Sequence, residues 1–396
     1  MTIRFAERME RLGTESAFEV LARARQLEAQ GQSVVHLEIG EPDFATPPNI
    51  VEAAVSALQG GATHYTPAGG IPEVRQSLAR FVSGRTGVAV DPAEVVLVPG
   101  SKNVVLFTLL SCVEPGDEVI YPDPGYPVYE SLTNFIGAQP VPVRLREDRD
   151  FRIDLDQLAS LITPRTKLLV VNTPHNPTGG VLTQEDVAEI ARLANEHDLL
   201  VISDEIYSQI VYDGAHVSLL SAPGMKERTV LLDGMSKAYA MCGWRLGYAV
   251  APRPLAERFE QLLINSSSCA AAFTQLAAME AWEAPESDVA VDNMVTTFKR
   301  RRDLLVAGLN RLPGVRCRLP QGAFYAFPNI EETGLGEREL AQGLLEEAGV
   351  AVLAGTAFGD GGRGFIRLAY TQAEVDIELA LERMDAYLAT KRVSAV

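Results

Sequence analysis

The 396-residue sequence has few cysteines and no long apolar segment. Cys112, Cys242, Cys269 and Cys317 lie far apart and lack the spacing of a metal finger or a redox pair. We therefore expect reduced cysteines, as in a cytoplasmic protein. The longest strongly apolar runs, such as 104–113, are too short to cross a membrane. The charged N-terminal stretch has no apolar core, so we expect no secretory signal there.

The sequence also lacks an excess of positive charge. Lysine and arginine number 35 against 52 aspartates and glutamates, which gives a net charge of −17. This surplus of carboxylates repels phosphate backbones and anionic lipid, so we expect neither nucleic acid nor a membrane surface as a partner. A cleft can still carry a local positive field, and an anionic small molecule is not excluded.

Strands and helices alternate from about residue 95 to residue 250. Continuous apolar strands are predicted at 95–98, 117–121, 167–171, 199–202 and 230–232. The recurring order of strand, helix and strand predicts an α/β fold, a mostly parallel sheet sandwiched by helices. Apolar side chains at successive positions fit strands that are buried on both faces.

The length exceeds the size at which one hydrophobic core keeps growing, so two domains are expected. A helix is predicted over 14–30 with Thr14 as its N-cap. A long helix is predicted over 289–312, and its basic run at 299–302 is expected to face solvent. The short strands and helix that follow predict a smaller α+β domain.

Ligands of parallel sheets bind at the carboxyl ends of the strands. Polar side chains that could act on a ligand are predicted at or just past such ends. They are Ser101, Tyr126, Asn176, Asp204, Tyr207, Lys237 and Arg245. One rim of the sheet can therefore hold all of them.

The turn Pro99-Gly100-Ser101-Lys102-Asn103 joins the strand at 95–98 to an apolar helix. Free amides at the start of that helix, together with its polar side chains, form a ready anion cradle. The alternative is an ordinary turn between a strand and a helix.

Lys237 follows a buried strand and lies between apolar segments, where an amine that traps a carbonyl group would sit. If the ligand is a phosphorylated pyridine aldehyde, Lys237 would bind the aldehyde and Asp204 the ring nitrogen. The other assignments are Asn176 and Tyr207 to the ring oxygen, Tyr126 to the ring face, Ser101, Lys102, Ser236 and Arg245 to the phosphate, and Arg367 to a substrate carboxylate. Singly, each residue has a structural alternative: a solvated lysine, a turn cap, a core aromatic or a surface ion pair.

Several motifs resemble those of the class I aminotransferases, the pyridoxal-phosphate enzymes of fold type I. These motifs are Ser236-Lys237-Ala238-Tyr239 with Gly243-Trp244-Arg245-Leu246-Gly247, Asn176-Pro177-Thr178-Gly179, Ser203-Asp204-Glu205-Ile206-Tyr207 and Gly40-Glu41-Pro42-Asp43-Phe44. The likeness runs from about residue 4 to residue 390. It implies a large cofactor-binding domain at 46–288 and a small domain made of 1–45 and 289–396.

The resemblance also implies the roles of single residues. Lys237 is the lysine that binds pyridoxal 5'-phosphate covalently. The implied cofactor site is Ser101, Lys102, Asn103, Tyr126, Asn176, Asp204, Tyr207, Ser236, Lys237 and Arg245. Arg367, in Phe365-Ile366-Arg367-Leu368-Ala369, grips the α-carboxylate of the substrate, assisted by Gly40 and Asn176. Tyr65 reaches the phosphate of the neighbouring subunit, which implies a homodimer with shared active sites.

By this resemblance the protein is an aminotransferase that moves an amino group between an L-amino acid and a 2-oxo acid by a ping-pong mechanism. The same residues would also serve a lyase or cyclase acting on an amino acid. A non-catalytic sensor of the cofactor or of amino acids is a further alternative.

Three positions depart from the family pattern. Tyr126 stands where many relatives have a tryptophan, and Cys242 where they commonly have a threonine. Glu15 stands where aspartate-using prokaryotic relatives have small and hydroxyl residues. A carboxylate at that position disfavours a second carboxylate on the substrate, so aspartate is not expected as the preferred donor.

Overall fold

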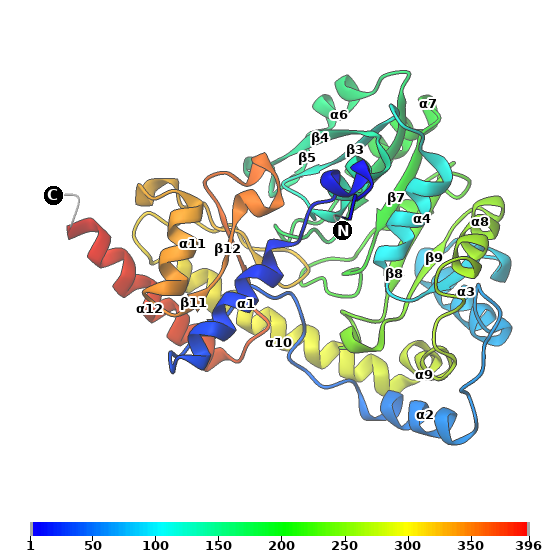
Figure 1. Cartoon of the computed structure of the whole chain (residues 1–396), viewed down its shortest axis with the longest axis horizontal. Coiled ribbons are helices and arrows are strands. Elements are labelled where there is room, and N and C mark those ends of the chain that lie inside the picture. Colours follow the sequence, from blue (N-terminus) through cyan, green and yellow to red (C-terminus); the bar gives the residue numbers. More distant parts are fainter. Residues whose placement is uncertain (1–2, 394–396) are drawn as a thin grey trace.

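The computed structural model describes residues 3–393. An eight-stranded sheet forms the centre of its larger part (Figure 1). In spatial order the strands are β2 (Val95–Val98), β9 (Gly247–Val250), β8 (Thr229–Gly234), β7 (Leu200–Asp204), β6 (Thr166–Asn172), β3 (Glu118–Asp123), β4 (Gln139–Arg146) and β5 (Arg152–Ile153). Strands β8, β7, β6, β3 and β4 pair in parallel, which confirms the predicted mostly parallel sheet.

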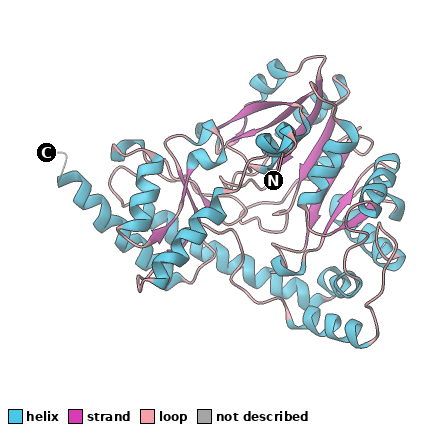
Figure 2. Ribbon diagram, in the orientation of Figure 1, coloured by secondary structure: helices cyan, strands magenta, loops and turns pink. Residues whose placement is uncertain are grey.

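Helices cover both faces of this sheet (Figure 2). Along β6, Leu168 and Val170 belong to one buried cluster, whereas Leu169 and Val171 belong to another. This alternation shows why the strand is apolar at every position. The helices of this part are α2 (Pro48–Gln59), α3 (Pro72–Thr86), α4 (Lys102–Cys112), α5 (Val128–Ile136), α6 (Leu155–Leu161), α7 (Gln184–Glu196), α8 (Arg253–Ile264) and α9 (Ala272–Glu283).

A second part is built from both ends of the described chain. Its strand β1 (Val35–His36) pairs in parallel with β11 (Val350–Ala351), and a three-stranded sheet has the order β10-β13-β12. The remaining elements of this part are β10 (Tyr325–Ala326), β12 (Leu353–Ala354), β13 (Ile366–Ala369), α1 (Ser16–Ala29), α11 (Glu337–Glu346) and α12 (Glu374–Val393). In Figure 1, α10 (Pro285–Leu309) runs from α9 to α12 and so connects the two parts.

Single turns of 3-10 helix lie between these elements. They are η1 (Glu7–Arg11), η2 (Pro92–Glu94), η3 (Glu147–Arg149), η4 (Leu219–Ser221), η5 (Cys242–Trp244), η6 (Glu331–Thr333), η7 (Gly355–Phe358) and η8 (Asp360–Gly362).

The start of α1 differs from the prediction. The N-cap residue is Glu15 rather than Thr14, and its side chain makes no capping hydrogen bond. The Thr14 hydroxyl instead donates to Glu19 Oε1 at 3.2 Å. Because Glu15 does not cap the helix, its carboxylate is free to point elsewhere.

The expectation that 299–302 faces solvent is wrong for two of its arginines. Arg301 and Arg302 are buried in α10. Arg301 forms two hydrogen bonds with the carboxylate of Asp43, at 2.7 and 2.8 Å, and Arg302 donates to the Pro320 carbonyl at 3.0 Å. The helix is covered by both parts of the molecule, and buried arginines are tolerated when they are paired in this way.

The four cysteines are free, which agrees with the absence of finger or redox-pair spacing. Among the residues from 3 to 393, no helix is both long and apolar enough to cross a membrane.

Candidate active site

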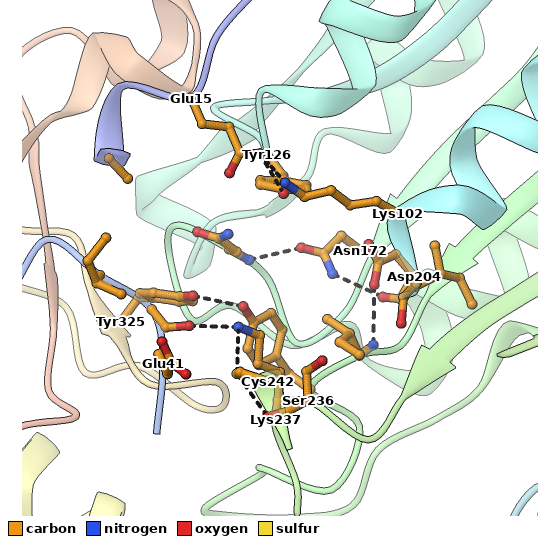
Figure 3. A pocket seen from close by; sticks show the side chains of 18 of the residues that line it. Glu15, Glu41, Lys102, Tyr126, Asn172, Asp204, Ser236, Lys237, Cys242 and Tyr325 are labelled. Atoms are coloured by element: carbon orange, nitrogen blue, oxygen red, sulfur yellow. Dashed lines mark hydrogen bonds and ion pairs between the residues drawn. The ribbon is translucent and has the colours of Figure 1, made fainter. Parts of the chain in front are cut away.

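A cavity of about 480 Å³ lies where the carboxyl edge of the large sheet meets the second part (Figure 3). Its wall contains all of the predicted site residues except Asn103 and Tyr65. Those that line it are Gly40, Ser101, Lys102, Tyr126, Asn176, Asp204, Tyr207, Ser236, Lys237, Arg245 and Arg367. The rule that parallel sheets bind ligands at strand ends therefore located this cavity.

Arg245 reaches the cavity by a route that the sequence did not indicate. It precedes β9 rather than following the carboxyl end of a strand. Because β9 runs antiparallel to β8, its first residue, Gly247, lies opposite Gly234, the last residue of β8. The start of β9 is thus at the same sheet edge as the ends of the parallel strands.

Asp204 is the last residue of β7, and its carboxylate is buried against the cavity. Tyr129 donates to Asp204 Oδ2 at 2.7 Å, and the Ile206 amide donates to Oδ1 at 3.2 Å. Burial raises the pKa of Asp204 to about 6, although the hydrogen bond from Tyr129 opposes the rise. A cationic group placed in the cavity would favour the ionised form.

Lys237 is half-buried and is not a solvated loop lysine. Its Nζ donates to the Gly40 carbonyl at 2.6 Å and lies 3.9 Å from Cys242 Sγ (Figure 3). Asp204 and Lys237 therefore line the same cavity, Asp204 from the end of β7 and Lys237 from the loop just past the end of the neighbouring β8.

Ser101 and Arg245 form a tightly packed corner of the cavity. The Ser101 hydroxyl donates to the Asp233 carbonyl at 2.9 Å, and Arg245 Nη1 donates to the Cys242 carbonyl at 2.7 Å. A Cβ atom at Gly234 or Gly247 would overlap the Ser101 hydroxyl. This corner also receives the start of α4, where the helix dipole is positive, and so it fits an anion such as a phosphate.

Lys102 and Asn103 lie in the same turn but point away from this corner. The Lys102 ammonium pairs with the Glu15 carboxylate and lies 5.6 Å from the centre of the Tyr126 ring. Tyr126 also donates to Glu15, at 3.3 Å (Figure 3). The Asn103 amide donates back to the Pro99 carbonyl at 3.1 Å and thereby holds the turn.

Arg367 is buried at the opposite side of the cavity, on β13. It donates to Asn176 Oδ1 at 3.3 Å and to the Glu38 carbonyl, and burial lowers the pKa of its guanidinium. Its Nε has no hydrogen-bond partner among the residues that the structure describes. A buried guanidinium with a free donor fits a ligand carboxylate.

The cavity residues that the sequence did not indicate include three with polar side chains that form hydrogen bonds at the site: Tyr129, Asn172 and Tyr325. Asn172 ends β6, so the strand-end rule would have found it. Its amide donates to the Asp204 carbonyl at 3.0 Å. Tyr129 lies in α5 and Tyr325 in β10, and no local pattern marks either as a site residue.

Tyr65 does not line the cavity, and the residue is 88% exposed. A role for this residue within its own subunit therefore has no support in the structure.

Comparison with known proteins places these residues in a family. Residues 32–384 match the model of the class I and II aminotransferases. The chain is 40% identical over 368 residues to aromatic-amino-acid aminotransferase 2 of Thermococcus litoralis, covering 92% of this chain and 94% of the relative. It is 39% identical to the arginine–pyruvate transaminase of Pseudomonas aeruginosa, covering 93% of each.

A solved structure, the aspartate aminotransferase from Thermus thermophilus with maleate, superposes with a TM-score of 0.94 at 37% identity and covers 98% of this chain and 100% of that one. The predicted fold class and the predicted enzyme class are thus both confirmed. The chain belongs to the class I and II aminotransferases and is a transaminase.

Proposed function

We propose that this transaminase binds pyridoxal 5'-phosphate in the cavity and moves an amino group between an L-amino acid and a 2-oxo acid in two half-reactions. The observation that carries the proposal is the placement of Asp204 and Lys237 at adjacent strand ends, facing one cavity. The names of the relatives support transamination over the elimination and cyclisation that the same residues would also serve.

The residues present fit the cofactor. When bound, pyridoxal phosphate supplies an aldehyde carbon and an electron-withdrawing ring. Ser101, Ser236 and Arg245 would hold the phosphate in the packed corner, and Asp204 would hold the ring nitrogen in its protonated form. Lys237 would bind the aldehyde, Asn176 and Tyr207 would donate to the ring oxygen, and Tyr126 would cover the ring face.

The chain's own groups then carry the proton and orient the substrate. The Lys237 amine would serve as the base that takes the proton from the substrate Cα and as the acid that gives it up again. Arg367 holds the α-carboxylate through paired hydrogen bonds, with Gly40 and Asn176 beside it. The low exposure of Asp204 and Arg367 strengthens these charge interactions, because little water screens them.

We further propose that the preferred donor has no second carboxylate. Glu15 pairs with Lys102 at the cavity wall, so this cation is already matched by a carboxylate. The relatives are named for aromatic amino acids, for arginine with pyruvate, and for aspartate. In this chain the carboxylate of Glu15 disfavours aspartate as the donor, because aspartate carries a second carboxylate.

We propose a cytoplasmic homodimer in which Tyr65 of each subunit completes the phosphate site of the other. The exposure of Tyr65 outside its own cavity supports a role across an interface, and the free cysteines support the location. We also propose that 46–288 and the remaining residues act as large and small domains, with the boundary in the first turn of α10.

A panel of amino acids and 2-oxo acids tests this function. The purified protein with pyridoxal phosphate is titrated with each amino acid while the cofactor spectrum is recorded. We expect donors to convert the cofactor to its aminated form and 2-oxo acids to restore it. Conversion without regeneration, or a spectrum that no amino acid changes, would contradict transamination.

A further inference from the structure

Tyr325 enters the cavity from the second part of the molecule, opposite the strand ends that carry the cofactor residues. It is buried on β10 and lines the cavity. Its hydroxyl lies 2.8 Å from the hydroxyl of Tyr207, and its ring lies 4.5 Å from the guanidinium carbon of Arg367 (Figure 3). One side chain thus contacts both the proposed ring-oxygen donor and the proposed carboxylate-binding arginine.

The backbone around Tyr325 is shaped for its hydroxyl. A Cβ atom at position 40 would overlap the Tyr325 hydroxyl, so the glycine at that position leaves the space that this hydroxyl fills. The Gly40 carbonyl in turn accepts the hydrogen bond from Lys237. The Tyr325 hydroxyl is therefore fixed between Gly40 and Tyr207.

The number of hydrogens decides which hydroxyl donates. Each tyrosine hydroxyl has one hydrogen, and either oxygen can accept. If Tyr207 gives its hydrogen to a cofactor oxygen, it has none for Tyr325, and Tyr325 must then be the donor. A hydroxyl that accepts such a bond becomes a stronger donor itself, because bonds in a chain polarise one another.

We propose that Tyr325 is a positioning residue that donates to Tyr207 and so directs the Tyr207 hydrogen toward the ring oxygen of the cofactor, while its ring backs the guanidinium of Arg367. The inference rests on the proposed binding of pyridoxal phosphate. In this arrangement Tyr325 contacts both Arg367, which holds the substrate carboxylate, and Tyr207, which stabilises the charge on the ring oxygen of the cofactor.

The two contacts of Tyr325 can be separated by substitution. Tyr325→Phe keeps the ring against Arg367 and removes only the hydroxyl. Tyr325→Leu removes both the hydroxyl and the planar face that the guanidinium stacks on. The first variant tests the link to Tyr207, and the second adds the link to Arg367.

The first experiment is a pH titration of the visible absorption of the enzyme with bound pyridoxal phosphate. A weaker donor at Tyr207 stabilises the ionised ring oxygen less. We therefore expect Tyr325→Phe to raise the pKa of the bound chromophore by roughly half a unit to one unit. In a Tyr207→Phe background, the same substitution is expected to add no further shift, because Tyr325 acts through Tyr207.

The matched control is Tyr212→Phe. Tyr212 is also buried, and its hydroxyl donates a hydrogen bond to the Ala323 carbonyl, but it does not line the cavity. It should leave the chromophore pKa unchanged, and thermal unfolding of all variants verifies that they are folded. An unchanged chromophore pKa in Tyr325→Phe, or an equal shift in the Tyr207→Phe background, would overturn the inference.

The second experiment compares steady-state constants for one amino acid. Tyr325→Leu should raise KM several-fold more than Tyr325→Phe, since only the former exposes one face of Arg367. Equal KM values for the two variants would contradict the stacking role. A wild-type protein that develops no pH-dependent cofactor absorption would instead refute the proposed function, so the two failures are distinguishable.

Discussion

The hydroxyl of Tyr129 donates a 2.7 Å hydrogen bond to Oδ2 of Asp204, and both groups are buried. The bond comes from α5 and fixes a carboxylate that ends β7. It does not offset the loss of water around that carboxylate, since burial still raises the pKa of Asp204 to about 6. In the cofactor-free protein the ionised carboxylate of Asp204 therefore lowers the stability of the fold, and a cationic ligand beside it would remove this loss.

Asp204→Asn should stabilise the cofactor-free protein and weaken it as an enzyme. The folded pKa of about 6 lies above the ordinary value of 3.8, so the folded state binds more protons between these pH values. Stability of the wild type thus falls as pH rises from 3.8 to about 6, and the loss is complete above that. The variant escapes this loss, which amounts to roughly 2 to 3 kcal/mol at pH 7. Thermal unfolding against pH measures the gain.

Asp233→Asn is the control for that experiment. Asp233 is a buried aspartate of the neighbouring strand, its pKa is raised to about 7 by burial, and it does not line the cavity. We expect a similar gain in stability with cofactor affinity and turnover retained. Equal losses of turnover in both variants would show that Asp204 has no special role.

Lys237→Ala should abolish the visible absorption of the bound cofactor and reduce turnover to a trace. The loss of a positioned proton carrier alone costs ~10²- to 10⁴-fold in rate, and loss of the covalent attachment adds to it. Lys391→Ala, on the surface of α12, serves as the control. Substantial exchange of the Cα proton of an amino acid by Lys237→Ala would contradict its role as the base.

Arg367→Ala should raise KM for every α-amino acid, whatever its side chain. Removing one partner of a buried charge pair costs about 2 to 5 kcal/mol, so kcat/KM should fall by roughly 30-fold or more. Arg363→Ala removes a nearby arginine whose side chain is 73% exposed, and it should have little effect. A loss confined to one amino acid would mean that Arg367 reads the side chain instead.

Tyr65→Phe tests whether the sites are shared. In a mixed dimer with Lys237→Ala, one site combines an intact Lys237 with an intact Tyr65 if the tyrosine crosses the interface. We expect that site to recover wild-type affinity for pyridoxal phosphate, measured as activity at limiting cofactor. If the Tyr65→Phe subunits keep their weakened affinity after mixing, each site is complete within its own subunit.

Glu15→Gln should shift the preference of the enzyme toward dicarboxylic donors, because it frees the Lys102 ammonium. The pair is partly exposed, so we expect a rise of roughly twofold to fivefold in kcat/KM for aspartate relative to a neutral amino acid. Adding Lys102→Gln should cancel the rise. Glu19→Gln, one turn along α1, is the control. An unchanged ratio would show that Glu15 does not select the donor.

Much of the large sheet and of the cavity could be predicted because the signals are local. Strands such as β6 are apolar throughout, and their ends carry polar residues such as Asp204. The direction of β9 could not be predicted in this way, because an apolar strand has the same sequence pattern whether it pairs in parallel or antiparallel. Arg245 was therefore placed at the correct edge for an incorrect reason.

Long-range pairing explains the other differences. Arg301 is buried because Asp43, 258 residues away, neutralises it. Tyr325 reaches the site through the hydrogen bond between its hydroxyl and that of Tyr207, 118 residues away. A single sequence shows that Arg301 is charged and that Tyr325 is aromatic, but it does not show which residue either of them contacts. Both contacts depend on tertiary packing between segments that are far apart in the chain.

The pairing of β1 with β11 aligns Val35 with Val350 and brings Gly40 to the same cavity as Arg367. The two halves of the proposed substrate grip, Gly40 and Arg367, therefore come from segments more than 300 residues apart and meet only when both have joined the second part of the molecule. The residues proposed to hold the cofactor, such as Asp204 and Lys237, all come from the chain between these two segments, so the cofactor site and the substrate grip are encoded separately and share one cavity only in the folded molecule.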